Sequence, residues 1–244
     1  MKSKHLVLLL LVSISTASQA QFLKNLGNTV GINTGSAGGG FTQDEAARAI
    51  KEALSNGIIK GVDKVSVADG YFKNPSIKIP FPPEAQKVEN ALRGIGMGSM
   101  VDDVVSSMNH AAENAAKAAA NIFLNAIKQM TLNDAMNMVN NKQQDAATQF
   151  LQRTTTDQLV SAFKPSIKEA LDKTGASKYW SDVMNQYNKI PFVSKVETDL
   201  PEYATRKAIS GLFFMIAKEE AAIRKDPLAR TSDLLKKVFG SVKN

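Results

Sequence analysis

An acidic residue on an apolar helix face is the feature of this sequence that most suggests chemistry. Glu219 lies in the middle of the apolar stripe of a helix predicted over residues 201–225. If that stripe faces the core, the carboxylate is buried and must be neutral or paired. We expect Arg153 or Arg224 to be its partner, so these three residues form a candidate buried polar cluster.

Two interpretations of this cluster are open. Burial could raise the pKa of the Glu219 carboxyl group and suit it to proton transfer, or the group could anchor a ligand in a polar pocket. A structural ion pair could instead fix the register of the helix. The structural interpretation is favoured, because a lone acid without a nucleophile or a second acid makes a poor active site.

His110 and Glu113 are weaker candidates for catalysis or metal binding. His110 is the one histidine that follows the N-terminal segment interpreted below as cleaved, and the chain has no cysteine. A zinc site would then need one histidine plus carboxylates, which is an uncommon ligand set. On a predicted helix, Glu113 and Lys117 have the spacing of an ion pair beside a solvated His110. We therefore expect no metal, no cofactor and no catalytic residue.

The motifs of common enzyme classes are absent from the sequence. It contains no Gly-x-Ser-x-Gly elbow, phosphate-binding loop or dinucleotide fingerprint between a predicted strand and a helix. Residues 94–98 are rich in glycine, but they join two predicted helices, so we interpret them as a tight turn.

Composition and charge limit the remaining function classes. The chain has 244 residues, 43% of them hydrophobic, and 30 Lys and Arg against 23 Asp and Glu give a net charge of +7. Much of the excess lies in residues 224–244, with six cations and two acids. This basic end permits weak contact with an anionic membrane surface. A solvated helix face is the favoured alternative, and nucleic acid is not an expected partner.

The N-terminus has the pattern of an export signal. Lys2 and Lys4 precede an apolar run over residues 6–14, and Ser18 and Ala20 fit a cleavage site. We therefore predict a signal peptide over residues 1–20 and a periplasmic protein. Without a cysteine to acylate, it would not be a lipoprotein. Residues 21–41 are rich in glycine and are predicted to form a tether.

The rest of the chain predicts an all-α, single-domain helix bundle over residues 42–244. Thr42 and Glu45 have capping-box spacing at the first helix, which Gly57 and Gly61 should weaken near its end. A proline-rich extended connector, with room for one short edge strand, is expected at about 69–83. The other predicted helices cover residues 84–93, 99–130, 131–140, 144–154, 155–164, 177–188, 201–225 and 227–239. The tripeptide Ile-Pro-Phe occurs at both 79–81 and 190–192, which is too short to establish duplication.

Four groups of short strings resemble one known family. They are Asp69-Gly70-Tyr71-Phe72 with Asn74-Pro75 and Ile79-Pro80; residues 126–131; Ala146-Ala147-Thr148 with Arg153-Thr154-Thr155; and Ile223-Arg224 with Asp226-Pro227, Arg230-Thr231 and Val238-Phe239-Gly240. In this order they resemble the bacterial domain of unknown function 4197 family, over nearly the whole chain from Phe41. The resemblance implies an exported, largely helical protein and transfers no catalytic residue.

These observations favour a non-enzymatic periplasmic module that binds an apolar ligand, such as a lipid, or an envelope protein. Nine methionines and eleven phenylalanines permit an adaptable apolar groove, although core packing explains them equally well. One alternative is a hydrolase that uses paired carboxylates such as Glu219 and Glu113, which would have to face one cleft. The other is a purely structural envelope protein.

Overall fold

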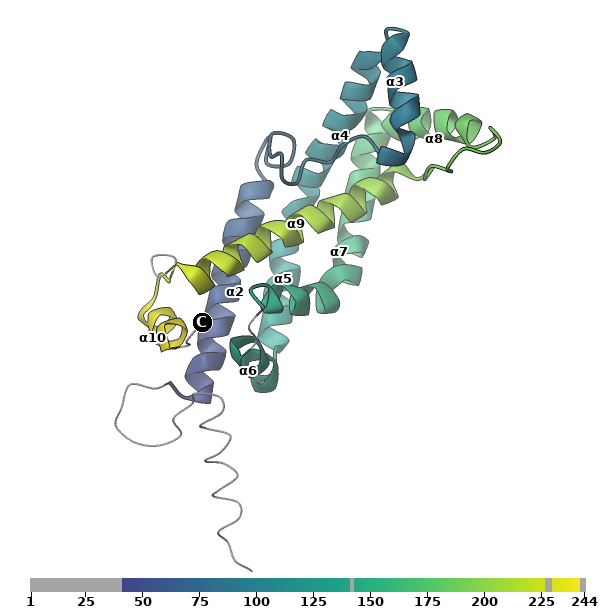
Figure 1. Cartoon of the computed structure of the whole chain (residues 1–244). Helices are drawn as coiled ribbons and strands as arrows, with labels where there is room; N and C mark the ends of the chain where they lie inside the picture. The colour runs from purple at the N-terminus through teal and green to yellow at the C-terminus, as the bar shows by residue number, and fades with distance from the viewer. Residues whose placement is uncertain (1–40, 141–142, 227–229, 242–244) are drawn as a thin grey trace, which may run out of the picture.

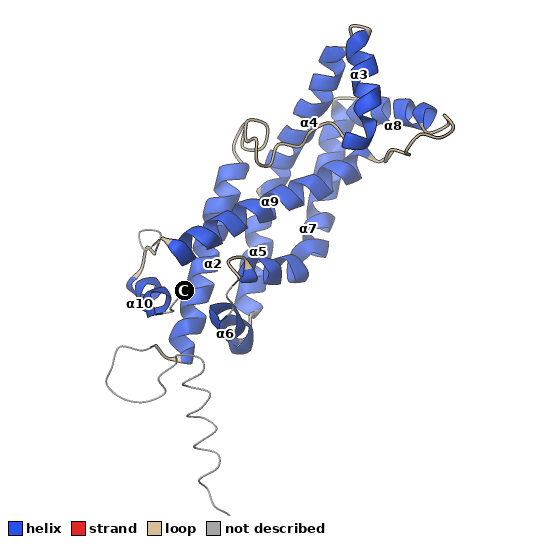
Figure 2. Ribbon diagram, viewed as in Figure 1, coloured by secondary structure: helices blue, strands red, loops and turns tan. Residues whose placement is uncertain are grey.

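The computed structural model describes residues 41–140, 143–226 and 230–241. The predicted signal peptide, all but the last residue of the predicted tether, Pro227 and Lys243 lie outside the described residues. Within the described residues the chain forms helices joined by turns and loops, with no strand (Figure 2). The all-α prediction is therefore confirmed.

The helices follow the predicted order along the chain. They are α2 (Gln43–Val65), the short 3-10 helix η1 (Pro83–Ala85), α3 (Gln86–Gly94), α4 (Gly98–Ala116), α5 (Ala119–Gln129), α6 (Leu132–Asn140), α7 (Ala146–Lys173), α8 (Ala176–Tyr187), α9 (Leu200–Lys225) and α10 (Asp233–Ser241).

These helices pack around one core and form an elongated bundle. Helix α9 crosses the front of the bundle and packs against α2, α4 and α7 (Figure 1). Helices α3 and α8 lie at one end, whereas α6 and α10 lie at the other end, beside the first half of α2. The largest fully buried side chains include Phe123, Phe163 and Tyr71. Both ends of the molecule are thus attached to a core that α2, α4, α7 and α9 share.

Two glycines in α2 allow α9 to approach closely. A Cβ atom at Gly61 would lie 3.3 Å from Ile216 Cγ1, and one at Gly57 would lie 3.6 Å from Glu219 Cβ. The expectation that these glycines weaken the end of the helix is wrong, because α2 continues to Val65. Packing against α9 offsets the lower helix propensity of glycine at these positions.

Two predicted helix boundaries are also wrong. The single helix predicted over 99–130 is divided at Lys117 and Ala118, where the Ala118 amide donates to Ala115 O over 3.1 Å in a tighter turn. The two helices predicted over 144–164 are instead part of one helix, α7, which contains Pro165. The hydroxyl of Thr155 does not cap a helix but donates to Leu151 O, one turn earlier. Packing of α5 and α7 against each other overrides these local signals.

The first helix has the predicted capping box, and a contact from the other end of the chain extends it. The Glu45 amide donates to the Thr42 hydroxyl oxygen, and the Thr42 amide donates to the Glu45 carboxylate, as the sequence predicts. Lys237 Nζ in α10 also donates to Glu45 Oε1 over 2.6 Å. The hydrogen bond from Lys237 and the backbone bond from Thr42 lower the pKa of Glu45 from 4.5 to about 2.

This arrangement predicts a pH dependence at the junction of α2 and α10. Since the pKa of Glu45 is lower in the folded chain, its stabilising contribution is present above pH 4.5 and is lost as the pH falls towards about 2. In Lys237→Gln we expect an NMR titration to show a higher pKa for Glu45. The neighbouring Lys236→Gln is the control, because Lys236 pairs with Asp233. If both variants leave the pKa of Glu45 unchanged, α10 does not hold this position in solution.

Candidate functional site

The buried acid of α9 is Glu220, the residue next to the predicted Glu219. Its residue exposure is 8%, and both carboxylate oxygens face the first turn of α7. Oε1 accepts from the Ala147 amide over 3.1 Å, and Oε2 accepts from the amide and the hydroxyl of Thr148, both over 2.8 Å. Glu220 therefore caps α7 from another helix, where free N–H groups and the helix dipole favour a negative charge.

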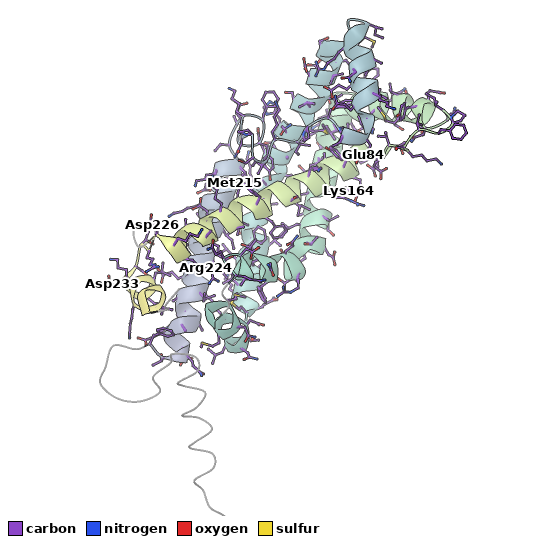
Figure 3. The ribbon with its side chains drawn as sticks, in the orientation of Figure 1. Glu84, Lys164, Met215, Arg224, Asp226 and Asp233 are labelled. Atoms are coloured by element: carbon purple, nitrogen blue, oxygen red, sulfur yellow. The ribbon has the colours of Figure 1, made fainter. Side chains whose placement is uncertain are left out.

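Arg224 completes this cluster one turn further along α9. Its Nε and Nη2 atoms donate to Glu220 Oε1 over 3.0 and 2.9 Å, and Nη2 also donates to Met138 O in α6 over 3.2 Å. Figure 3 shows Arg224 close to the C-terminal end of α9. The Glu220–Arg224 pair thus ties together the end of α6, the start of α7 and the end of α9.

The basic residues near the C-terminus largely contact groups of the same chain. Arg230 donates to Ile223 O and Arg224 O, over 3.2 and 2.9 Å, and so binds free carbonyl groups at the end of α9. Lys236 and Lys237 pair with Asp233 and Glu45, as described above. Membrane contact through this basic segment stays a prediction.

A small cavity lies beside the Glu220–Arg224 pair. It measures about 20 Å³, which is room for one water molecule, between α2, α7 and α9. Its lining residues are Ile50, Ala53, Leu54, Gly57, Ala147, Ile216, Glu220, Ile223 and Arg224. Because the carboxylate already binds three donors of α7 and the guanidinium group, this arrangement holds helix ends together rather than presenting a reactive acid.

The predicted cluster of Glu219, Arg153 and Arg224 is not brought together. Glu219 pairs with Lys64 of α2, and its side chain is 13% exposed. Arg153 is exposed on α7. The pKa of Asp134 is lowered mainly by hydrogen bonds from Thr131, with a smaller contribution from the charge of Arg153. Glu219 lies over α2 because one residue along a helix is a rotation of about 100°, so Glu220 and not Glu219 faces α7.

Glu113 is the second buried acid, and it binds the segment that follows α2. It is 4% exposed. Oε1 accepts from the amides of Tyr71 and Phe72 over 3.0 and 3.1 Å, and Oε2 lies 2.8 Å from His110 Nδ1. The expected pair with Lys117 is wrong, since Lys117 donates to Asn114. Glu113 faces the segment 66–82 and not solvent, whereas His110 lies at the surface beside the Phe72 ring.

Asn109, which the sequence reasoning missed, holds the same segment one turn before Glu113. Its Oδ1 accepts from the Ile79 amide and its Nδ2 donates to Ile79 O, both over 2.8 Å. A neighbouring strand would make the same pair of bonds, so the Asn109 side chain takes the place of a partner strand, and the segment itself forms no strand. The available signal was only an asparagine four residues before an acid on a predicted helix.

Tyr71 attaches the segment to α9 as well. Its hydroxyl donates to Ala208 O over 2.7 Å, and burial raises the pKa of its phenol well above the ordinary value. Its ring fills the space beside Gly211, where a Cβ atom would lie 2.9 Å from Tyr71 Cε1. Residues 66–82 are therefore fixed between α4 and α9.

An apolar groove lies between α3, α4 and α8, close to Phe81 at the end of this segment. The groove encloses a free volume of about 20 Å³. Its lining residues are Phe81, Leu92, Met100, Val101, Val104, Tyr179, Trp180, Val183 and Met184. The Phe81 and Trp180 rings meet edge to face, with 5.0 Å between their centroids.

Residues 40–240 match the protein family described as a protein of unknown function (DUF4197). The chain belongs to this family. The resemblance noted in the sequence is thus confirmed, and the strings that carry it supply partners of the buried polar residues in this DUF4197 chain. Tyr71, Phe72 and Ile79 bind Glu113 and Asn109, whereas Ala147 and Thr148 bind Glu220.

No curated protein and no solved structure matches this DUF4197 chain. Among the residues that the structure describes, no group of three or more His, Cys, Asp or Glu could hold a metal ion. None of the described helices combines the length and the apolar character that crossing a membrane requires. Within the same residues, no contact joins Glu113 to Glu219, and their partners differ.

Proposed function

We propose that the protein is a non-enzymatic binding module that takes an apolar ligand in the groove between α3, α4 and α8. The observation that carries this proposal is the lining of the groove, which consists of apolar and aromatic side chains from three helices and Phe81. Such a surface recognises an alkyl chain or a ring through burial of apolar area.

The cover of the groove is its least strongly attached wall. None of the residues of α3, all of which the structure describes, is buried, and the helix packs mainly on α4. Gly96 in the α3–α4 turn has a φ of 84°, which glycine adopts without strain. Arg93 bridges Glu89 and Asp102 at the surface, and such exposed pairs contribute little to stability. Displacing α3 would expose the half-buried Val88 and Leu92 but no fully buried residue of α3, and it would open the groove to a ligand.

The contacts of the two buried acids support a binding role and not a catalytic one. Glu113 and Glu220 each accept backbone N–H groups from a neighbouring segment, so their charge stabilises the fold. A general acid or base needs access to a proton of the substrate. We also propose that the chain is exported, and the ligand would then come from the cell envelope.

The chain's one tryptophan provides the test. Trp180 lines the groove and is 3% exposed, with its indole N–H donating to Glu197 O over 2.8 Å. We expect titration with palmitate to change the Trp180 fluorescence saturably, and native mass spectrometry to show one retained fatty acid. Val183→Glu places a charge in the groove and should weaken palmitate binding by about tenfold or more.

The matched control is Asn185→Glu, which adds the same charge to an exposed position of α8. This variant should bind palmitate as the natural chain does. Equal binding by the two variants, or no fluorescence change and no retained mass, would contradict the groove as a binding site and would favour a purely structural protein.

A further inference from the structure

The loop between α8 and α9 displays large apolar side chains to solvent. It projects from the end of the molecule that α3 and α8 form (Figure 2). Ile190 is 52% exposed and Phe192 is 107% exposed, so the Phe192 ring has no cover from the described chain. Full exposure of a phenylalanine forgoes about 1.5–3 kcal/mol of favourable burial. An arrangement that leaves the ring in water suggests a ligand outside the chain.

The backbone at the loop tip supports the same conclusion. Phe192 has a φ of 64°, in the left-handed region that bulky residues rarely adopt. Strained residues of this kind persist where the surrounding structure holds them, and they gather at binding sites. The strained residue and the fully exposed ring are therefore the same residue.

The base of the loop is held firmly. Asn188 Nδ2 donates to Val196 O over 2.9 Å, and the Val196 amide donates back to Asn188 Oδ1 over 2.8 Å. Val196 itself is buried, and Trp180 binds the carbonyl group of Glu197. The loop over residues 189–195 is thus a protrusion whose base is closed by one amide side chain.

The other Ile-Pro-Phe sequence shows what the same residues do when the fold has a place for them. At 79–81, Ile79 and Phe81 are buried, and Asn109 holds the backbone of Ile79. At 190–192, the same tripeptide is turned outwards. The difference lies in the surroundings and not in the residue types.

Charge identifies the class of partner. Lys189 and Lys195 flank the tip, and no acidic residue occurs between Asp182 and Glu197. Lys189 donates to the neutral side chain of Gln186, and within the described residues neither lysine pairs with a carboxylate. An apolar tip between two lysines matches the boundary of an anionic bilayer, where rings enter the acyl region and cations remain among the headgroups.

We infer that the loop over residues 189–195 binds the surface of an anionic lipid bilayer, with Phe192 and Ile190 inserted and Lys189 and Lys195 at the headgroups. A stable protein interface typically covers about 800 Å² on each side, whereas a bilayer can bind a tip of a few residues. The inference goes beyond the proposed function and does not depend on a ligand in the groove.

Vesicle sedimentation tests this inference. It uses the full-length gene product, purified after any N-terminal processing in the cell. We expect binding to vesicles of phosphatidylcholine with phosphatidylglycerol, weaker binding to phosphatidylcholine alone, and a decrease with added salt. Phe192→Ser should weaken binding by about tenfold to a hundredfold. Lys189→Gln with Lys195→Gln should weaken it by about thirtyfold on the anionic vesicles.

The control is Phe214→Ser, which removes another exposed phenylalanine, on α9. It should bind vesicles as the natural chain does. The Phe192 and lysine variants should keep the natural melting temperature because the altered side chains are exposed. Equal binding by Phe192→Ser and Phe214→Ser, or no vesicle binding at all, would overturn the inference. So would a photoreactive residue at position 192 that crosslinks to protein and never to lipid. Loss of vesicle binding in Phe192→Ser with an unchanged palmitate response would separate the loop from the groove.

Discussion

Replacing Glu220 with alanine is expected to lower the free energy of unfolding by about 3–5 kcal/mol, the range found when one partner of a buried ion pair is removed. The variant would leave the Arg224 guanidinium group without its carboxylate, at a position where its side chain is only 13% exposed. It would also leave the amides of Ala147 and Thr148 without an acceptor. Urea denaturation followed by far-ultraviolet circular dichroism measures the change.

The neighbouring Glu219→Ala is the matched control for this prediction. It removes the same side chain one residue earlier, where the partner is the half-exposed Lys64. The Glu219 carboxylate is largely covered, but its partner is solvated and no backbone amide depends on it, so this variant should lose clearly less stability than Glu220→Ala. If the two variants lose the same stability, Glu220 does not cap α7 in solution. If Glu219→Ala is the more damaging variant, the rotation of α9 described here is wrong.

This pair of residues shows how far the sequence could predict the site. The apolar stripe of α9 and the presence of an acid within it can be recognised from spacing alone. The choice between Glu219 and Glu220 depends on where the first turn of α7 meets α9, and that is a long-range contact. Arg224 pairs with Glu220 and not with the predicted Glu219, at a spacing of four residues that is local to α9. Arg153 lies outside this pair, since its position depends on how far α7 extends.

The helix ends show the same division between local and tertiary information. The cap at Thr42 forms as predicted, and Thr131 and Asp134 cap α6 in the same way, because each cap needs only residues within one helical turn. Thr155 has a similar local pattern but lies inside α7, where its hydroxyl bonds back to Leu151 O. Local signals allow a helix to begin there, and packing decides that it does not.

The segment over residues 66–82 was the part least accessible to sequence reasoning. Its prolines exclude a helix, but they do not indicate that α4 carries an amide and a carboxylate four residues apart to hold it. The position of Glu113 suggested a solvated ion pair with Lys117 by the usual helix spacing. Its burial follows only from the presence of the segment above it.

Replacing Glu113 with alanine should therefore release this segment. The amides of Tyr71 and Phe72 would lose their acceptor, and an unsatisfied buried group costs about 1–3 kcal/mol. We expect a loss of about 2–6 kcal/mol in the free energy of unfolding, with faster hydrogen exchange at the amides of residues 71, 72 and 79.

Two further variants distinguish the carboxylate's acceptor role from its charge. Glu113→Gln keeps an oxygen that can accept from both amides, so it should be milder than alanine and should keep the slow exchange of Tyr71 and Phe72. Lys117→Ala removes the residue that helix spacing alone would pair with Glu113, and should change stability by less than about 0.5 kcal/mol. Unchanged exchange at Tyr71 and Phe72 in Glu113→Ala would show that another group accepts these amides. A loss of stability in Lys117→Ala as large as in Glu113→Ala would instead restore the solvated pair that helix spacing predicts.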